Sequence, residues 1–185
     1  MRIVFMLKAA MFHSDISYQI ELINKINSLN ITANVNTVNS IFNNKNIKQV
    51  PVDLIYGICV ATNTSPGDWI KLVDDNGQEW VGDCLPLDSS ICYPPGVTFL
   101  YKREEKESTP ELIKKIAQHN IHVERTTIWK MEKNTLKRLP LDLILGISII
   151  TGKAPGDWIR VVDPNGNEIK GKGIRLDGTI VESQS

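Results

Sequence analysis

The fold is decided by a stretch of sequence that occurs twice. Residues 51–82 read PVDLIYGICVATNTSPGDWIKLVDDNGQEWVG, and residues 140–171 read PLDLILGISIITGKAPGDWIRVVDPNGNEIKG. More than half of the aligned positions are identical, which chance does not produce. Self-similarity of this kind indicates a repeated structural unit. The sequence therefore predicts two tandem copies of one small fold.

The similarity continues upstream of the duplicated stretch. Residues 21–26 align with residues 111–116, and Thr37 falls opposite Thr127, with one residue fewer before the proline in the second copy. The repeat therefore includes a helical segment as well as the duplicated stretch.

These alignments set the expected domain boundaries. We predict a first repeat over residues 1–85, a linker over 86–96 and a second repeat over 97–185. The linker contains Pro-Pro-Gly, which is typical of connecting segments. Short β-prone runs, residues 2–5 and 97–100, begin the two repeats.

Each repeat is predicted to continue with two helices. Residues 108–111, Ser-Thr-Pro-Glu, form a strong helix start, because a hydroxyl caps the helix, proline suits its first turn and glutamate complements its dipole. They predict a helix near 110–119, with a counterpart near 18–29. A second, short helix follows, and its apolar stripe comprises Val35, Val38, Ile41 and Phe42 in repeat one and Thr127, Ile128 and Met131 in repeat two.

A third helix and a β-hairpin complete the predicted unit. Pro51 and Pro140 suit the first turn of this helix, and the Pro-Gly pairs at 66–67 and 155–156 are expected to end it.

The hairpin strands are expected at Trp69–Val73 and Gln78–Val81. In the second copy Pro164 excludes a type I′ turn, so we predict a type I turn with glycine in a bulge for both repeats. The predicted fold class is α+β, with tandem duplicated helical units that are each followed by a β-hairpin.

Composition and charge limit the partners and the cellular location that we expect for this protein. Lysine plus arginine equals aspartate plus glutamate at 21 each, so the net charge supports neither nucleic-acid nor membrane-surface binding. Residues 102–138 are nevertheless locally basic. The three cysteines lack the spacing of metal ligands, so we expect no metal site. We also expect a reducing, cytoplasmic location. The apolar run at the N-terminus is too short to span a membrane and is interpreted as folded structure.

Several motifs follow one another in the same order in both repeats. A short helix beginning Thr-Val or Thr-Ile precedes a polar loop, a Pro-x-Asp-Leu-Ile helix start and Pro-Gly-Asp-Trp-Ile. This pattern resembles the XRE-type, Cro-like helix-turn-helix family of phage and bacterial regulators. In this sequence the pattern occupies residues 37–45, 51–55 and 65–70, and again residues 127–131, 140–144 and 154–159.

In that family the helix before the polar loop lies in the major groove of double-stranded DNA. The resemblance implies that its exposed residues contact base edges and that nearby cations contact phosphates. It further implies a sequence-specific transcriptional regulator that acts as an intramolecular pseudo-dimer without a cofactor. The implied DNA-binding residues are Asn36, Thr37, Asn39, Ser40, Asn43 and Lys45 in repeat one, and Arg125, Thr126, Trp129, Lys130, Lys133, Lys137 and Arg138 in repeat two.

Other functions stay open. A module that binds another protein, or a second copy of itself, agrees with the neutral net charge and the asparagine-rich helix. An RNA-binding protein would stack bases on Trp80 or Trp129. The lysines of repeat two also fit an ordinary solvated helix face. Exposure of Trp129 would favour a binding face.

The remaining sequence features do not indicate a catalytic site. The Pro-Gly-Asp-Trp motif is expected to be structural, with its tryptophans packed on the helices. The sequence contains no nucleophile elbow, phosphate-binding loop or dinucleotide-binding motif, and His13, His119 and His122 lack metal-ligand spacing. We therefore do not expect an enzyme.

Overall fold

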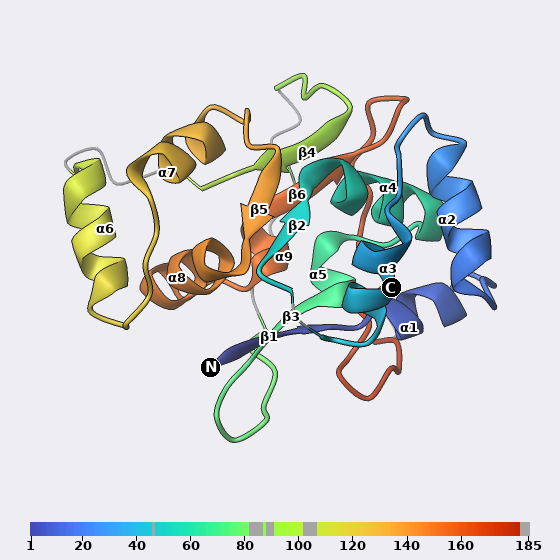
Figure 1. Ribbon diagram of the computed structural model, residues 1–185, viewed down its shortest axis with the longest axis horizontal. Helices are drawn as coiled ribbons and strands as arrows, with labels where there is room; N and C mark the ends of the chain where they lie inside the picture. Colours follow the sequence, from blue (N-terminus) through green and yellow to red (C-terminus); the bar gives the residue numbers. More distant parts are fainter. Residues whose placement is uncertain (46, 82–86, 88–90, 102–106, 182–185) are drawn as a thin grey trace.

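The computed structural model describes residues 1–45, 47–81, 87, 91–101 and 107–181. It is an α+β fold of short helices and small antiparallel sheets (Figure 1). Residues 1–85 are called the N-terminal half below, and residues 97–185 the C-terminal half. Lys102, Arg103 and Lys106 of the expected basic stretch, and part of the expected linker, lie outside the described residues.

The order of elements is similar in the two halves. The N-terminal half contains β1 (Arg2–Phe5), α1 (Leu7–Phe12), α2 (Gln19–Asn27), α3 (Val35–Phe42), β2 (Gln49–Pro51), α4 (Val52–Thr62), α5 (Pro66–Trp69) and β3 (Ile70–Val73). The C-terminal half contains β4 (Gly96–Phe99), α6 (Thr109–Ala117), α7 (Arg125–Glu132), β5 (Arg138–Pro140), α8 (Leu141–Thr151), α9 (Pro155–Trp158) and β6 (Ile159–Val162). Within the described ranges, no helix combines the length and apolarity that crossing a membrane requires.

The predicted long helices are confirmed as α2, α4, α6 and α8. The start of α6 follows its sequence signature, because the Glu111 carboxylate accepts the Ser108 backbone N–H at 2.7 Å while the Ser108 hydroxyl caps the Glu111 N–H. The N-terminal apolar run forms β1 and α1.

The prediction for Pro-Gly-Asp-Trp was wrong in one respect. The motif does not merely end the preceding helix; it forms the separate short helices α5 and α9. The Asp68 carboxylate accepts the Ser65 backbone N–H at 2.8 Å, and that of Asp157 accepts the Ala154 N–H at 2.8 Å. Each aspartate thus closes a helical turn that the proline begins, and Trp69 ends α5 instead of opening a strand.

The hairpin prediction also needs correction. β3 pairs along its whole length with β1, from Arg2 opposite Val73 to Phe5 opposite Ile70. β4 and β6 pair in the same way. The returning arm of the first hairpin contributes the bridge between Val73 and Glu79, together with nearby backbone hydrogen bonds. β3 is buried throughout, so the apolar N-terminal strand is its main partner.

The turns themselves are as predicted. Gly77 and Gly166 have φ angles of 82° and 85°, and each donates its N–H to the carbonyl of Asp74 or Asp163. Glycine adopts this left-handed conformation without steric cost.

The two halves are joined through their centre. β2 pairs antiparallel with β5, so that Val50 lies opposite Leu139, and both side chains are fully buried. Figure 1 shows these two strands side by side in the middle of the molecule. Behind them α5 contacts α9, where Gly67 meets Gly156. One hydrophobic core contains residues of both halves.

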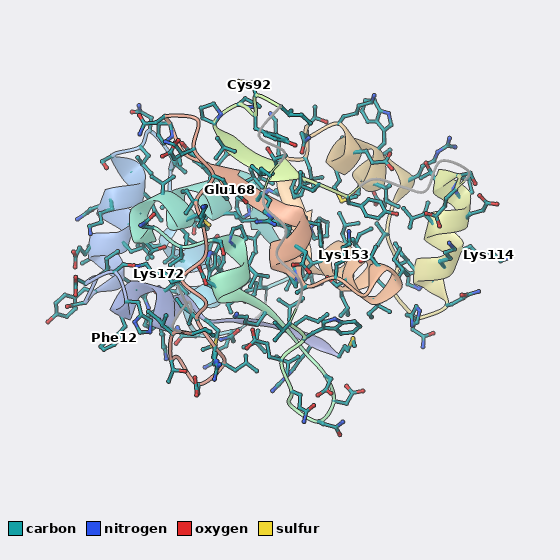
Figure 2. All side chains as sticks on the ribbon, turned by 180° about the vertical axis from the view of Figure 1, so that it is seen from behind. Phe12, Cys92, Lys114, Lys153, Glu168 and Lys172 are labelled. Atoms are coloured by element: carbon teal, nitrogen blue, oxygen red, sulfur yellow. The ribbon has the colours of Figure 1, made fainter. Side chains whose placement is uncertain are left out.

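The segment after β6 extends onto the N-terminal half. The Asp68 carboxylate accepts the backbone N–H groups of Lys172, Gly173 and Ile174 at 2.8, 2.8 and 3.2 Å. The Lys172 ammonium donates to the His13 carbonyl at 2.7 Å, and Figure 2 shows Lys172 on this segment. Asp68 therefore has two roles: it closes α5 and it anchors the C-terminal segment.

Candidate nucleic-acid interface

α3 is held in place by packing on one side and by a cap at its first turn. Val38 and Ile41 are fully buried, while Asn34 accepts the Thr37 N–H at 3.2 Å as the N-cap. Thr37 is half-buried at this capped turn. The remaining residues of the predicted N-terminal site are exposed or half-buried: Asn36, Asn39, Ser40, Asn43 and Lys45.

One amide of this group is committed to its own helix. The Asn43 side chain donates to the Asn39 carbonyl at 2.9 Å, which orients it along α3. Asn36 and Ser40 are spaced four residues apart and so lie on one helix face.

The helix α7 has a similarly buried side and a different outer surface. Ile128 and Met131 are fully buried. Trp129 is 55% exposed. An exposed tryptophan of this kind favours a binding face. The other predicted residues of this helix and its C-cap are all exposed: Arg125, Thr126, Lys130 and Lys133.

An asparagine fixes the chain immediately after each helix. Asn44 has a φ of 53°, and its side chain accepts the Phe5 N–H at 2.5 Å and donates to the Phe5 carbonyl at 2.9 Å. Asn134 has a φ of 52° and accepts the Phe99 N–H at 2.7 Å. These bonds tie the end of α3 to β1 and the end of α7 to β4.

The paired strands β2 and β5 connect the two helix regions. The Lys137 carbonyl accepts the Val52 N–H at 2.9 Å, and the Lys48 carbonyl accepts the Leu141 N–H at 2.9 Å. The side chains of Lys137 and Arg138 are exposed, so both predicted cations project from this central pair. Figure 1 shows α3 and α7 on opposite sides of the strands.

A hollow lies between α3 and β2. Its volume is about 340 Å³, and it is lined by Asn36, Thr37, Ser40, Ile47, Lys48 and Gln49. Three of the predicted residues thus share one concave surface. Amide, hydroxyl and ammonium groups of this kind bind base edges and phosphates.

Lys48 and Gln49 were missed by the sequence reasoning. Both are exposed, both line the hollow, and Gln49 belongs to β2. The internal alignment contained the signal, because these positions precede Pro51 as Lys137 and Arg138 precede Pro140.

Five cations of the predicted DNA-binding residues lie in the C-terminal half, on α7, at its C-cap and around the start of β5. Among the described residues, no ion pair involves Arg125, Lys130, Lys133, Lys137 or Arg138. Two acids lie beside them in the sequence: Glu124, which is exposed, and Glu132, which is half-buried. Residues 124–138 thus contain five cations and two acids.

A second cavity, of about 280 Å³, opens near α5 and α9. Its wall includes the Lys71–Glu79 ion pair, with a Nζ to Oε1 distance of 2.7 Å, and the indole of Trp80. The ammonium and the carboxylate satisfy one another there. Across the described ranges, no three His, Cys, Asp or Glu residues are grouped to hold a metal ion.

Comparison with known proteins found no matching family model, no similar curated protein and no similar solved structure. The residues and their geometry are therefore the basis for assigning a function.

Proposed function

We propose that this protein is a sequence-specific double-stranded DNA-binding regulator of transcription, built from two equivalent units fused in one chain. In this proposal the units form an intramolecular pseudo-dimer, and α3 and α7 each enter a major groove. Two-fold dimers of helix-turn-helix proteins place such helices about 34 Å apart, one helical turn of DNA.

Matched interactions support the equivalence of the units. Phe5 lies 6.1 Å from Trp69 between ring centroids, and Phe99 lies 6.2 Å from Trp158. The ion pair Lys71–Glu79 likewise has a counterpart, in which Arg160 and Glu168 are 2.6 Å apart. Interactions within one half thus recur at aligned positions of the other.

The observation that carries the proposal is the pair of exposed polar helices flanking β2 and β5. α3 presents amides and a hydroxyl, α7 presents cations, and the strands between them present Lys48, Gln49, Lys137 and Arg138. Asparagine pairs with adenine and arginine with guanine in the major groove, while lysine neutralises phosphates. This combination suits a duplex better than it suits a small molecule.

The experiment is selection from a pool of random duplex DNA at two salt concentrations. We expect enrichment of a bipartite site, with an affinity that falls steeply as salt rises. A variant with Arg125, Lys130 and Lys133 changed to alanine should lose binding while its thermal unfolding is unchanged. Absence of binding at low salt refutes the proposal.

A second candidate is a protein-binding adaptor. It is favoured by apolar side chains on the same two helices, because Val35 is 51% and Trp129 is 55% exposed. An adaptor would show no salt-dependent binding to duplex DNA. Single-stranded RNA, added as a competitor in the same assay, separates an RNA-binding protein from both.

A further inference from the structure

We infer that the two halves contribute unequally to DNA binding: the C-terminal half makes most of the phosphate contacts, and the N-terminal half depends more on contacts with base edges. This inference rests on the proposed function and adds a role for each half. It follows from a position-by-position comparison of residues 35–49 with residues 125–138.

Structural features at both ends fix the alignment of residues 35–49 with residues 125–138. Asn44 and Asn134 share the left-handed conformation and the same bond to a phenylalanine of the first strand. At the other end, Gln49 lies opposite Pro140 and Arg138 opposite Pro51 in the β2–β5 register. Gln49 and Arg138 therefore occupy matched places in the two halves.

At four of the differing positions the C-terminal half has a cation where the N-terminal half has a neutral residue. Four residues of the N-terminal half correspond to cations: Val35, Ser40, Asn43 and Gln49 to Arg125, Lys130, Lys133 and Arg138, respectively. One exchange runs the other way, from Lys45 to Thr135. The resulting cations are two in the N-terminal segment, Lys45 and Lys48, and five in the C-terminal one, Arg125, Lys130, Lys133, Lys137 and Arg138.

The chemistry of each segment points to a different part of the duplex. All five C-terminal cations are exposed, and none forms an ion pair with a described acid, so each is available to a phosphate. Glu132 lowers the local positive charge without reversing it. The N-terminal segment contains no acid, and its hollow is lined by Asn36, Ser40 and Gln49, whose groups match base edges.

The test compares three variants of the protein. One variant gives the C-terminal half the residues of the N-terminal half: Lys130→Ser, Lys133→Asn and Arg138→Gln. A second variant removes reading groups without changing charge: Asn36→Ala and Ser40→Ala. A control removes three exposed lysines outside both segments: Lys114→Ser, Lys153→Asn and Lys170→Gln. Figure 2 shows Lys114 on α6 at one end of the molecule and Lys153 near α8.

The readouts are the slope of log K against log salt concentration and the sequences selected from random DNA. The first variant should lower the magnitude of the slope by about 2 to 3, because each phosphate contact contributes about 0.9. The second should keep the slope and lose base preference in one half-site. The control should change neither.

Equal slopes for the first variant and the control overturn the inference, as does a large loss of slope in the second variant. Both results leave DNA binding itself in place. If the unaltered protein does not bind duplex DNA at 50 mM salt, the proposed function fails, and this inference fails with it. Thermal unfolding of each variant verifies that the fold is intact.

Discussion

Gly67 and Gly156 pack backbone against backbone where α5 meets α9. A Cβ atom on Gly156 would lie 2.6 Å from the Cα of Gly67, and one on Gly67 would lie 2.9 Å from the Cα of Gly156. Both distances are shorter than van der Waals contact. Glycine in each Pro-Gly-Asp-Trp motif is therefore required by the other half of the chain.

The Gly156→Ala variant should be destabilised. Its methyl group meets backbone atoms, which cannot rotate away, and overpacking of this kind costs about 1–3 kcal/mol. Chemical denaturation measured by circular dichroism should show a lower midpoint. An unchanged midpoint would mean that α5 and α9 are not in contact in solution.

The Asp68→Asn variant should release the C-terminal segment. An asparagine replaces one acceptor oxygen by an NH₂ group that faces backbone N–H donors, and hydrogen bonds to a charged group contribute about 1.5–3 kcal/mol each. Hydrogen exchange at the amides of Lys172, Gly173 and Ile174 should accelerate. The exposed Asp15, changed to asparagine, is the matched control, and equal exchange in the two variants would contradict the anchoring role.

The turn at Asp163 should make stability depend on pH. Hydrogen bonds from Asn167, and then from Asn165, hold the pKa of the Asp163 carboxyl below its usual value. A pKa that is lower in the folded state adds stability above the unfolded pKa, and that stability is lost as pH falls through the folded pKa.

The measurement is the unfolding temperature of the native protein and of Asp163→Asn across the acidic range. The two curves should converge as pH falls, because the native carboxylate becomes protonated. A constant difference at every pH would show that the carboxylate charge has no part in the turn.

Trp129 should report DNA binding by fluorescence. Trp69 and Trp158 are 0% and 2% exposed, so a bound duplex would affect their emission little. Trp80 is half-buried and donates its indole N–H to the Gly152 carbonyl at 3.0 Å, and it lies outside the predicted DNA-binding residues. Adding duplex DNA should change the emission of the native protein, and this change should be largely absent from Trp129→Asn, which carries the residue found at the matching position 39. A full signal in the variant would place the duplex away from α7.

Local sequence patterns were sufficient for helices α2, α3, α4, α6, α7 and α8 and for the turns. The signature at Ser108 predicts the start of α6 because its donors and acceptors lie within four residues. The glycines at 77 and 166 predict left-handed turn positions for a similarly local reason. The apolar stripes predict the burial of Val38 and Ile41 on α3 and of Ile128 and Met131 on α7. They were wrong for Val35, which is 51% exposed at the start of α3.

Contacts between distant residues could not be predicted in this way. β2 and β5 are three residues long, too short for a period to be seen, and their pairing joins residues far apart in the chain. Lys48 and Gln49 were overlooked because they face the hollow only once the chain has folded back from α3 to β2.

The sequence by itself determined the internal similarity, the helices other than α1, α5 and α9, the turns and the unequal charge of the two halves, because each depends on neighbouring residues or on a direct alignment. Only the tertiary structure decided that β3 pairs with β1, that β2 pairs with β5 and that Asp68 holds residues 172–174. Those contacts are selected by the packing of one common core, and no local pattern encodes which surfaces that core brings together.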